Sequence, residues 1–267
     1  MEQGGLRTKG IIKRKGAGGK PLISVITVVY NGEKTLERAI KSVTGQTWDN
    51  IEYILIDGNS TDNSVEIIKK YGELIDFWIS EPDKGISDAF NKGVSYCTGD
   101  FFAFLGSDDW YEPDGVERIA EKIIPGREIY AGHANLWTDN GNTFVKLHKS
   151  RPERIFQTMR IAHPATFVSQ KVFEQIGGFS TEYKVAMDYD FMLRAKLKGF
   201  EIIVVDHVIT NMVLGGNSKD VLAASKDELR IKNKLIGVKL KHYLWFCIYI
   251  TGNRILSLFN KLPAHEK

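Results

Sequence analysis

Apolar residues along the chain form three short, continuous runs with helical patterns between them. The runs occupy residues 22–29, 51–56 and 101–105 and are rich in β-branched and aromatic side chains. Runs of this kind fit strands that are buried on both faces of a mostly parallel sheet. Residues 33–46 and 60–71 instead repeat their apolar positions with the period of a helix. The apolar faces comprise Leu36, Ala39, Ile40 and Val43 in the first helix and Val65, Ile68 and Tyr71 in the second. The alternation predicts an α/β fold with helices on both sides of the sheet.

Polar or acidic residues follow each of the three runs. Tyr30 and Asn31 come after the first run, Asp57 after the second, and Asp108 with Asp109 after the third. In open α/β sheets, ligands bind at the carboxyl ends of the strands, so these side chains should share one edge. Like charges repel unless a cation or hydrogen-bond donors lie among them, and Mg²⁺ or Mn²⁺ prefers oxygen ligands. The alternative is that one acid of the pair only caps the next helix.

Two further segments contain candidate chemistry. Residues 80–93 (SEPDKGISDAFNKG) form a turn before a helix, and Lys84 could bind an anion at the start of that helix or lie on a surface turn. Residues 186–194 (AMDYDFMLR) place Asp188 and Asp190 near the start of another helix. One of these carboxylates could accept the proton of an attacking hydroxyl, although capping of the helix explains them equally well.

Four blocks in a fixed order are similar to the motifs of glycosyltransferase family 2, the inverting enzymes with the GT-A fold. The blocks read ITVVYNGEKTLERAIKSVTGQTWDNIEYILIDGNSTDNS, SEPDKGISDAFNKG, TGDFFAFLGSDD and AMDYDFMLRA. The resemblance extends over residues 21–218 and is greatest to the branch that builds bacterial exopolysaccharide, capsule, O-antigen or colanic-acid units. It implies transfer from a UDP- or GDP-sugar to a saccharide or a polyprenyl-diphosphate-linked acceptor, with inversion.

The resemblance also implies roles for individual residues. Asp109, together with Asp108, would bind Mn²⁺ or Mg²⁺, and Asp188 would be the catalytic base. Met187 stands where the family commonly has Glu, which leaves Asp190 as a rival for the base. His163, in a segment similar to the acceptor side of the family, would touch the acceptor or the donor sugar, or be structural. The residues implied to bind the donor nucleotide are Thr27, Val29, Tyr30, Asn31, Asp57, Asp83, Lys84 and Asp108.

The two ends of the chain are basic, whereas the net charge of its 267 residues is only +3. The uncharged run 243–253 is too short to span a membrane. It suits a helix that lies in a membrane interface, with contact through 228–260, or one that packs on protein. The expected regions are a flexible basic arm (1–20), a catalytic domain (21–220) with nucleotide-binding (21–110) and acceptor-binding (111–220) halves, and a C-terminal amphipathic helical segment (221–267).

Composition and spacing narrow the function classes. The basic stretches lie outside the expected core and are not interleaved with aromatics across a fold face, which argues against nucleic-acid binding. Cys97 and Cys247 match no disulfide or metal spacing, so we expect reduced thiols and a cytoplasmic protein, on the inner face of the cell membrane if it is anchored. Residues 215–218 (GGNS) resemble a mobile loop of the family that closes over the donor, and a plain turn is the alternative. A nucleotidyltransferase or a non-catalytic sugar-nucleotide-binding scaffold remains the alternative.

Overall fold

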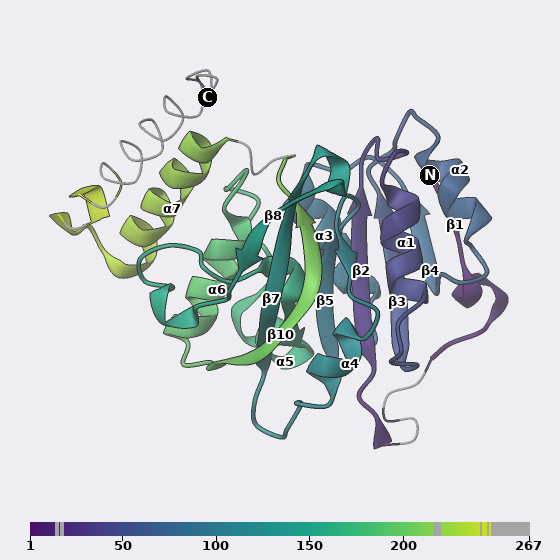
Figure 1. Ribbon diagram of the computed structural model, residues 1–267, viewed down its shortest axis with the longest axis horizontal. Helices are drawn as coiled ribbons and strands as arrows, with labels where there is room; N and C mark the ends of the chain where they lie inside the picture. Colours follow the sequence, from purple (N-terminus) through teal and green to yellow (C-terminus); the bar gives the residue numbers. More distant parts are fainter. Residues whose placement is uncertain (14–15, 17–18, 216–219, 241, 245, 247–267) are drawn as a thin grey trace, which may run out of the picture.

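The computed structural model describes residues 1–13, 16, 19–215, 220–240, 242–244 and 246. These residues form an α/β structure around one ten-stranded sheet, with helices on both of its faces (Figure 1). The strand order is β1-β4-β3-β2-β5-β9-β7-β10-β6, and β8 pairs with β7 outside this path. The predicted fold class is thereby confirmed.

The first half of the sheet is parallel. Strands β4, β3, β2 and β5 lie side by side, and every residue of β2 and β3 is buried, as the continuous apolar runs predict. The register pairs Val29 with Asp57 and Val28 with Gly106, so the strands end at the same edge. The elements of this half are β2 (Ile23–Val29), α1 (Leu36–Thr44), β3 (Ile51–Asp57), α2 (Ser64–Lys70), β4 (Phe77–Ser80), α3 (Ile86–Tyr96) and β5 (Phe101–Gly106).

The second half of the sheet is mixed. Strand β9 lies antiparallel between β5 and β7, whereas β10 is parallel to β7 and antiparallel to β6. Parallel pairing therefore dominates only the first half. The elements are β6 (Trp110–Tyr111), α4 (Gly115–Ala120), β7 (Ile129–Thr138), η3 (Asp139–Gly141), β8 (Thr143–His148), η4 (Pro152–Arg154), η5 (His163–Ala165), β9 (Thr166–Ser169), α5 (Gln170–Ile176), α6 (Met187–Leu197) and β10 (Ile202–Val213).

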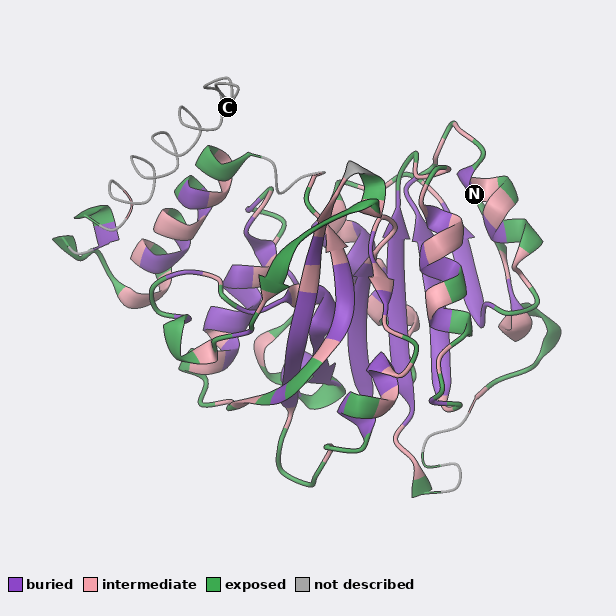
Figure 2. Cartoon of the chain, in the orientation of Figure 1, coloured by how far each residue is buried: buried purple, intermediate pink, exposed green. Residues whose placement is uncertain are grey.

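Two apolar clusters, one on each face of the sheet, form the core. Helices α1, α2 and α4 cover one face, where Leu36, Ile40 and Ile119 are buried, and the predicted apolar side of α1 is confirmed in full. Helices α3, α5 and α6 cover the other face through Phe90 and Phe191. Figure 2 shows the central strands buried, whereas β8 is exposed along its length.

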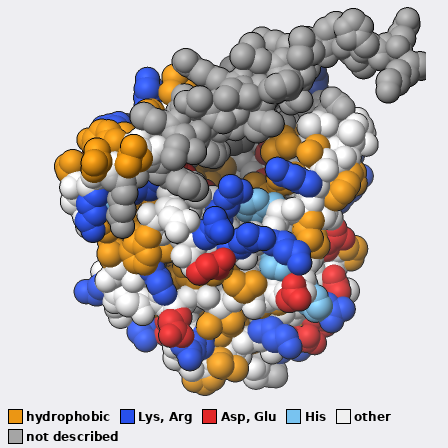
Figure 3. Space-filling view, turned by 60° about the vertical axis from the view of Figure 1, so that its left-hand side comes forward, with side chains coloured by type: hydrophobic (Ala, Val, Ile, Leu, Met, Phe, Trp, Pro, Cys, Tyr) orange, Lys and Arg blue, Asp and Glu red, His pale blue; other side chains and the backbone are white. Residues whose placement is uncertain are grey.

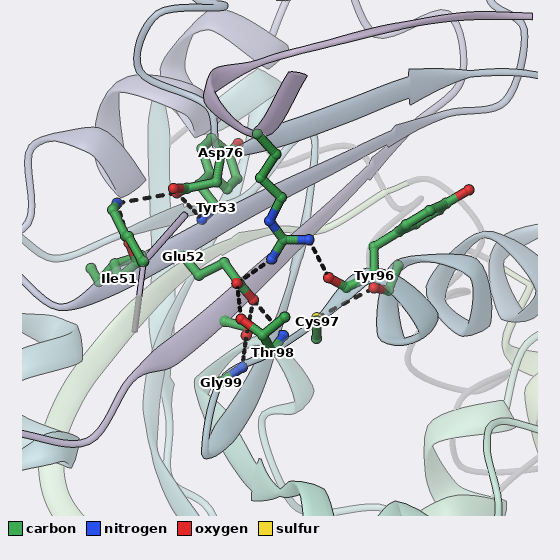
Figure 4. Close-up of polar contacts among 12 residues, drawn as sticks. Ile51, Glu52, Tyr53, Asp76, Tyr96, Cys97, Thr98 and Gly99 are labelled. Carbon is green, nitrogen blue, oxygen red and sulfur yellow. Dashed lines mark hydrogen bonds and ion pairs between the residues drawn. The ribbon is translucent and has the colours of Figure 1, made fainter. Parts of the chain in front are cut away.

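The N-terminal segment differs from the expected flexible arm. Glu2–Gly4 form β1, which pairs antiparallel with β4, and η1 (Leu6–Lys9) follows. Arg7 donates hydrogen bonds to the buried carboxylate of Glu52 and to the carbonyl oxygen of Tyr96 (Figure 4). The expectation was wrong because a Gly- and Lys-rich composition does not reveal that one arginine faces a buried acid.

A C-terminal helix is present as predicted. Helix α7 (Val221–Ile236) packs on α6, with Ile231 and Lys232 buried. Asp227 accepts hydrogen bonds from the backbone N–H groups of Lys184 and Val185. The described start of the 228–260 segment therefore contacts the catalytic domain. Residues 247–267, and the loop glycine at 216, lie outside the described residues.

None of the described helices combines the length and the apolar character that crossing a membrane requires.

Candidate active site

A pocket of about 680 Å³ lies at the carboxyl ends of the parallel strands, and we call it the strand-end pocket. Residues from the end of β2, the start of α3, η5 and the start of α6 line it. The parallel strands end at the upper edge of the sheet in Figure 1. Ligands bind at this edge in open α/β sheets, as the order of strands and polar residues in the sequence predicts. The predicted residues that line it are Val29, Tyr30, Asn31, Asp83, Asp108, Asp109, His163 and Asp188.

Asp108 and Asp109 occupy a tight turn directly after β5. The Asp109 N–H donates a hydrogen bond to the carbonyl oxygen of Gly106 at 3.2 Å. One carboxylate oxygen of Asp109 accepts a hydrogen bond from the N–H of Val213 at 2.9 Å. Asp109 is 7% exposed, whereas Asp108 is half-buried. Neither caps the next helix, which begins at Gly115 after Asp114.

The electrostatics of this turn suit a cation. Burial raises the pKa of Asp109 well above its usual value, and the neighbouring charge of Asp108 raises it further. Burial also raises the pKa of Asp108. A divalent ion would relieve this repulsion, and hard cations prefer carboxylate oxygens. Because no cluster of three or more His, Cys, Asp or Glu ligands converges within the described residues, phosphate oxygens and water would have to complete the coordination sphere of such an ion.

Arg38 was not predicted as a site residue, yet it holds the same turn. Its guanidinium donates hydrogen bonds to the carbonyl oxygens of Asp108 at 2.8 Å and Asn140 at 2.7 Å. The guanidinium carbon lies 3.8 Å from the ring centre of Trp110. Within α1, Arg38 resembles an ordinary solvent-facing arginine in sequence, so only the fold reveals its contact with a turn 70 residues away.

Asp188 lies in the first turn of α6 and faces the strand-end pocket. Burial raises its pKa to about 6, an effect opposed by the hydrogen bond that Tyr189 N–H donates to it at 2.7 Å. A carboxylate with such a pKa is ionised at neutral pH but is a stronger base than an ordinary aspartate. These properties suit proton abstraction from a hydroxyl group.

Asp190, the rival for this role, is buried and lies outside the pocket lining. Its carboxylate accepts a hydrogen bond from Nε of Arg194 at 2.8 Å. Arg194 in turn donates to the carbonyl oxygens of Ile176 and Gly178. Asp190 thus holds the end of α5 against α6, and the geometry favours Asp188 as the base.

Asp57, predicted to contact the base, is fully buried at the end of β3 and lies outside the pocket lining. It accepts hydrogen bonds from the N–H and hydroxyl of Ser60 at 3.0 and 2.5 Å and from the Ser80 hydroxyl at 2.6 Å. These bonds shape the turn beneath the pocket. Thr27 is also buried and does not line the pocket; its hydroxyl accepts a hydrogen bond from the Tyr53 hydroxyl. Lys84 is an exposed turn residue that does not line the pocket either.

Tyr30, Asn31 and Asp83 form one end of the pocket. Tyr30 is 65% exposed, which is unusual for an aromatic side chain in a pocket wall. Asn31 has φ 52° and accepts a hydrogen bond from the Thr61 N–H at 2.8 Å. A side chain at Gly58 would clash with Asp83, so this glycine leaves room for the carboxylate beside the turn.

His163 belongs to the pocket wall near α3. Its ring stacks on Phe104 with centroids 5.4 Å apart and meets Phe90 and Phe179 edge-on. Burial lowers its pKa to about 4, so the ring is neutral at physiological pH. Sequence reasoning missed two cations that line the same pocket, Lys34 and Lys184. Lys34 follows the predicted residue Asn31 by three positions, and Lys184 precedes Asp188 by four. This closeness in sequence was the available signal.

Residues 24–184 match the model of the family described as glycosyl transferase family 2. The chain belongs to this family. An uncharacterized glycosyltransferase of Mycobacterium tuberculosis is 32% identical over 186 residues, which are 66% of this chain and 70% of the relative. Chondroitin synthase of Pasteurella multocida is 28% identical over 211 residues, which are 75% of this chain and 21% of the synthase.

Solved glycosyltransferase structures share the fold. The mannosyltransferase PcManGT from Pyrobaculum calidifontis, in complex with GDP-Man and Mn²⁺, superposes with a TM-score of 0.65 at 16% identity and covers 82% of this chain and 65% of its own. S. aureus TarS in complex with UDP-GlcNAc gives a TM-score of 0.60 at 20% identity, with 79% and 64% covered. This chain therefore spans about a fifth of the chondroitin synthase and just under two thirds of each solved chain.

Proposed function

We propose that this family member transfers a sugar from a UDP- or GDP-sugar to a saccharide or a polyprenyl-diphosphate-linked acceptor, with inversion, during surface polysaccharide synthesis. The observation that carries the proposal is that Asp108, Asp109 and Asp188 line one strand-end pocket. Two acids at a strand end suit a diphosphate-bound metal, and a third with raised pKa suits a base. The neighbours named as complexes with UDP-GlcNAc and GDP-Man support a nucleotide-sugar donor.

The donor would enter with its nucleoside beside Tyr30, Asn31 and Asp83. The exposed Tyr30 ring offers a face on which a base can stack. Asp57 would contribute indirectly, by stabilising the turn that follows β3. A direct contact between Asp57 and the nucleobase would require its hydrogen bonds with Ser60 to break. This orientation places the diphosphate toward the Asp108–Asp109 turn and leaves the sugar between that turn and α6.

The acidic turn would hold Mn²⁺ or Mg²⁺, with Asp109 and then Asp108 as its protein ligands. The bound ion would supply positive charge to the diphosphate leaving group. Arg38 fixes the Asp108 carbonyl, and the Val213 N–H fixes one oxygen of Asp109. The second Asp109 oxygen and the Asp108 carboxylate would then be available to coordinate the ion.

Asp188 would accept the proton of the acceptor hydroxyl as its oxygen attacks the anomeric carbon. Attack from the side opposite the leaving diphosphate inverts that carbon in a single displacement. His163 stays neutral, so it forms an uncharged wall and does not compete for the proton. Placement at the cytoplasmic face of the cell membrane belongs to the same proposal, because a polyprenyl-linked acceptor resides in a membrane.

The test uses the full chain with a panel of UDP- and GDP-sugars and measures release of nucleoside diphosphate with Mn²⁺, with Mg²⁺ and with EDTA. We expect one donor to be cleaved with metal and spared in EDTA, and Asp188→Asn to lower the rate. A nucleotidyltransferase would instead release pyrophosphate from a nucleoside triphosphate and a sugar phosphate. A non-catalytic scaffold would bind a donor, detectable by thermal shift, without turnover.

A further inference from the structure

Positive charge gathers on one face of the second half of the protein. Figure 3 shows Lys and Arg side chains together in the middle of this face, beside histidines. Residues 143–160 carry five basic side chains against a single acid, Glu153, and we call this segment the basic face. Its cations are Lys146, Lys149, Arg151, Arg154 and Arg160, and all five are exposed.

None of these cations forms an ion pair within the described part of the chain. The exposed Asp206 is near enough to Lys149 for their charges to interact. Elsewhere the exposed basic residues are commonly paired, as Lys70 is with Glu37 and Lys171 with Glu128. The pKa of His148 is lowered chiefly by burial and then by the charges of Arg160 and Lys146. The basic face therefore carries a net positive charge, because Glu153 and Asp206 offset only part of the charge of its five cations.

Apolar side chains alternate with the cations. Strand β8 exposes Phe144 by 52%, Val145 by 43% and Leu147 by 39%, and Phe156 follows at 44%. Among the described residues, strand β8 pairs with β7 alone, and its side chains are exposed along almost the whole strand (Figure 2). Exposed apolar groups among unpaired cations mark an interaction site.

The segment is held in place on the domain. The Ser150 hydroxyl donates to the carbonyl oxygen of Gly132 at 2.6 Å and accepts from the Ala162 N–H at 3.0 Å. The Arg151 N–H donates to the carbonyl oxygen of Arg160 at 2.6 Å, which closes the loop. Ala162 directly precedes His163 in the pocket wall, so the basic face adjoins the strand-end pocket in the chain and in space.

We propose that the basic face, residues 143–160, binds the surface of an anionic lipid bilayer. Cations attract anionic headgroups, while aromatic and aliphatic side chains between them enter the interface. Val145 and Leu147 favour lipid over single-stranded nucleic acid, which is bound mainly by stacking on aromatic rings. A second copy of the chain is disfavoured, because pairing β8 with β8 would bring like charges together. The proposal does not depend on sugar transfer.

The test measures co-sedimentation of the full chain with phosphatidylcholine vesicles and with mixed phosphatidylcholine–phosphatidylglycerol vesicles. We expect binding to the mixed vesicles alone and weaker binding at high salt. Lys146→Glu with Lys149→Glu should weaken binding roughly tenfold or more. Val145→Ser with Leu147→Ser should also weaken it, because apolar insertion contributes. The matched control is Lys122→Glu with Lys198→Glu, two exposed lysines outside the face, which should bind as the unaltered chain does.

Thermal unfolding and donor cleavage by each variant verify that the fold is intact. Absence of binding to mixed vesicles by the unaltered chain would overturn the proposal. An equal loss of binding in both charge-reversal variants would also overturn it. Unchanged binding by the variant with Lys146→Glu and Lys149→Glu would do the same, because the contact would then belong to another segment. The proposal also fails if the face binds an RNA oligonucleotide and not vesicles, or if the reversals change the oligomeric state in size-exclusion chromatography.

Discussion

The carboxylate of Asp109 accepts a hydrogen bond from the backbone N–H of Val213 at 2.9 Å, across 104 residues of chain. Asp109 follows the last strand of the parallel half, and Val213 ends β10 in the mixed half. The acidic turn is therefore oriented by both halves of the sheet. Both residues also line the strand-end pocket, so the contact lies at the end of the pocket where we propose that the metal binds.

Replacing Asp109 by Asn should separate metal binding from folding stability. Burial and Asp108 raise the pKa of Asp109, so the ionised carboxylate costs folding free energy. Asn keeps an oxygen that can accept from Val213 but removes the charge. We expect the metal-free variant to gain about 1 kcal/mol, roughly 3 °C in Tm, and to lose the rise in Tm that Mn²⁺ gives the unaltered chain.

Differential scanning fluorimetry with and without Mn²⁺ measures both effects. Glu117→Gln is the matched control, because Glu117 is an acid of α4 outside the pocket lining. A variant that retains the full Mn²⁺-dependent rise in Tm would exclude Asp109 as a ligand. Donor cleavage that persists in EDTA would exclude metal dependence itself.

The rate of transfer should depend on the ionisation of Asp188. Its carboxylate must be deprotonated to act as a base, and its pKa is about 6. We expect kcat/KM to reach a plateau above that pH and to fall roughly tenfold per pH unit below it. Because the folded pKa exceeds the unfolded value, ionisation also costs stability, and this cost grows as the pH rises from about 4 to about 6. Asp188→Asn should remove both dependences and lower kcat by at least about a hundredfold.

Asp190→Asn is the contrasting variant. Its carboxylate bonds to Arg194 and not to the pocket, so we expect a loss of about 1–3 kcal/mol in the free energy of unfolding with little change in kcat. Pre-steady-state transfer assays and urea unfolding distinguish the two outcomes. If Asp190→Asn abolished transfer at full stability while Asp188→Asn did not, the assignment of the base would be reversed.

The parallel half was predictable from sequence because its signals are local. Strands buried on both faces leave continuous apolar runs, and Asp108 with Asp109 comes directly after one of them. Their shared edge follows from parallel register. Asp188 was predicted from a motif. To decide between Asp188 and Asp190, however, one must know the direction in which each side chain leaves α6, which sequence alone does not give.

Contacts between distant segments could not be read from sequence. Arg38 and Lys41 are both basic residues of α1, yet only Arg38 reaches the acidic turn. Arg7 lies in a Gly- and Lys-rich stretch, and nothing nearby indicates its buried partner. In both cases the arginine contacts an acceptor that is remote in sequence, and the two are adjacent only because the folded sheet brings their segments together.

Arg38 should position the acidic turn, where we propose that the metal binds. Replacement of Arg38 by Lys keeps the positive charge. It removes the pair of guanidinium hydrogen bonds to Asp108 and Asn140 and the stacking on Trp110. We expect Arg38→Lys to raise the Mn²⁺ concentration needed for half-maximal activity by roughly tenfold, with the pH profile of Asp188 unchanged. Arg118→Lys is the control, since Arg118 makes an exposed pair with Asp114. Equal Mn²⁺ titrations for the two variants would rule out a positioning role for Arg38.

The N-terminal segment should be an integral part of the domain. Glu52 has no exposed side-chain surface, and Arg7 is its ion-pair partner. The same carboxylate accepts hydrogen bonds from the Ser24 hydroxyl at 2.5 Å and the Thr98 N–H at 2.8 Å (Figure 4). Arg7→Ala leaves a buried charge without its counter-ion, so the free energy of unfolding should fall by about 3–5 kcal/mol.

Urea unfolding of three variants tests this role of Arg7. Lys9→Ala removes a neighbouring cation whose pair with Glu73 is exposed, so it should cost less than about 1 kcal/mol. Combining Arg7→Ala with Glu52→Gln should recover much of the lost stability, because the buried group is then neutral. A loss for Arg7→Ala no greater than that for Lys9→Ala would mean that β1 and η1 rest on the sheet without stabilising it. A large loss that Glu52→Gln relieves would instead show that β1 and η1 are an integral part of the domain, because the charge of Glu52, buried in β3, requires the arginine that this segment supplies.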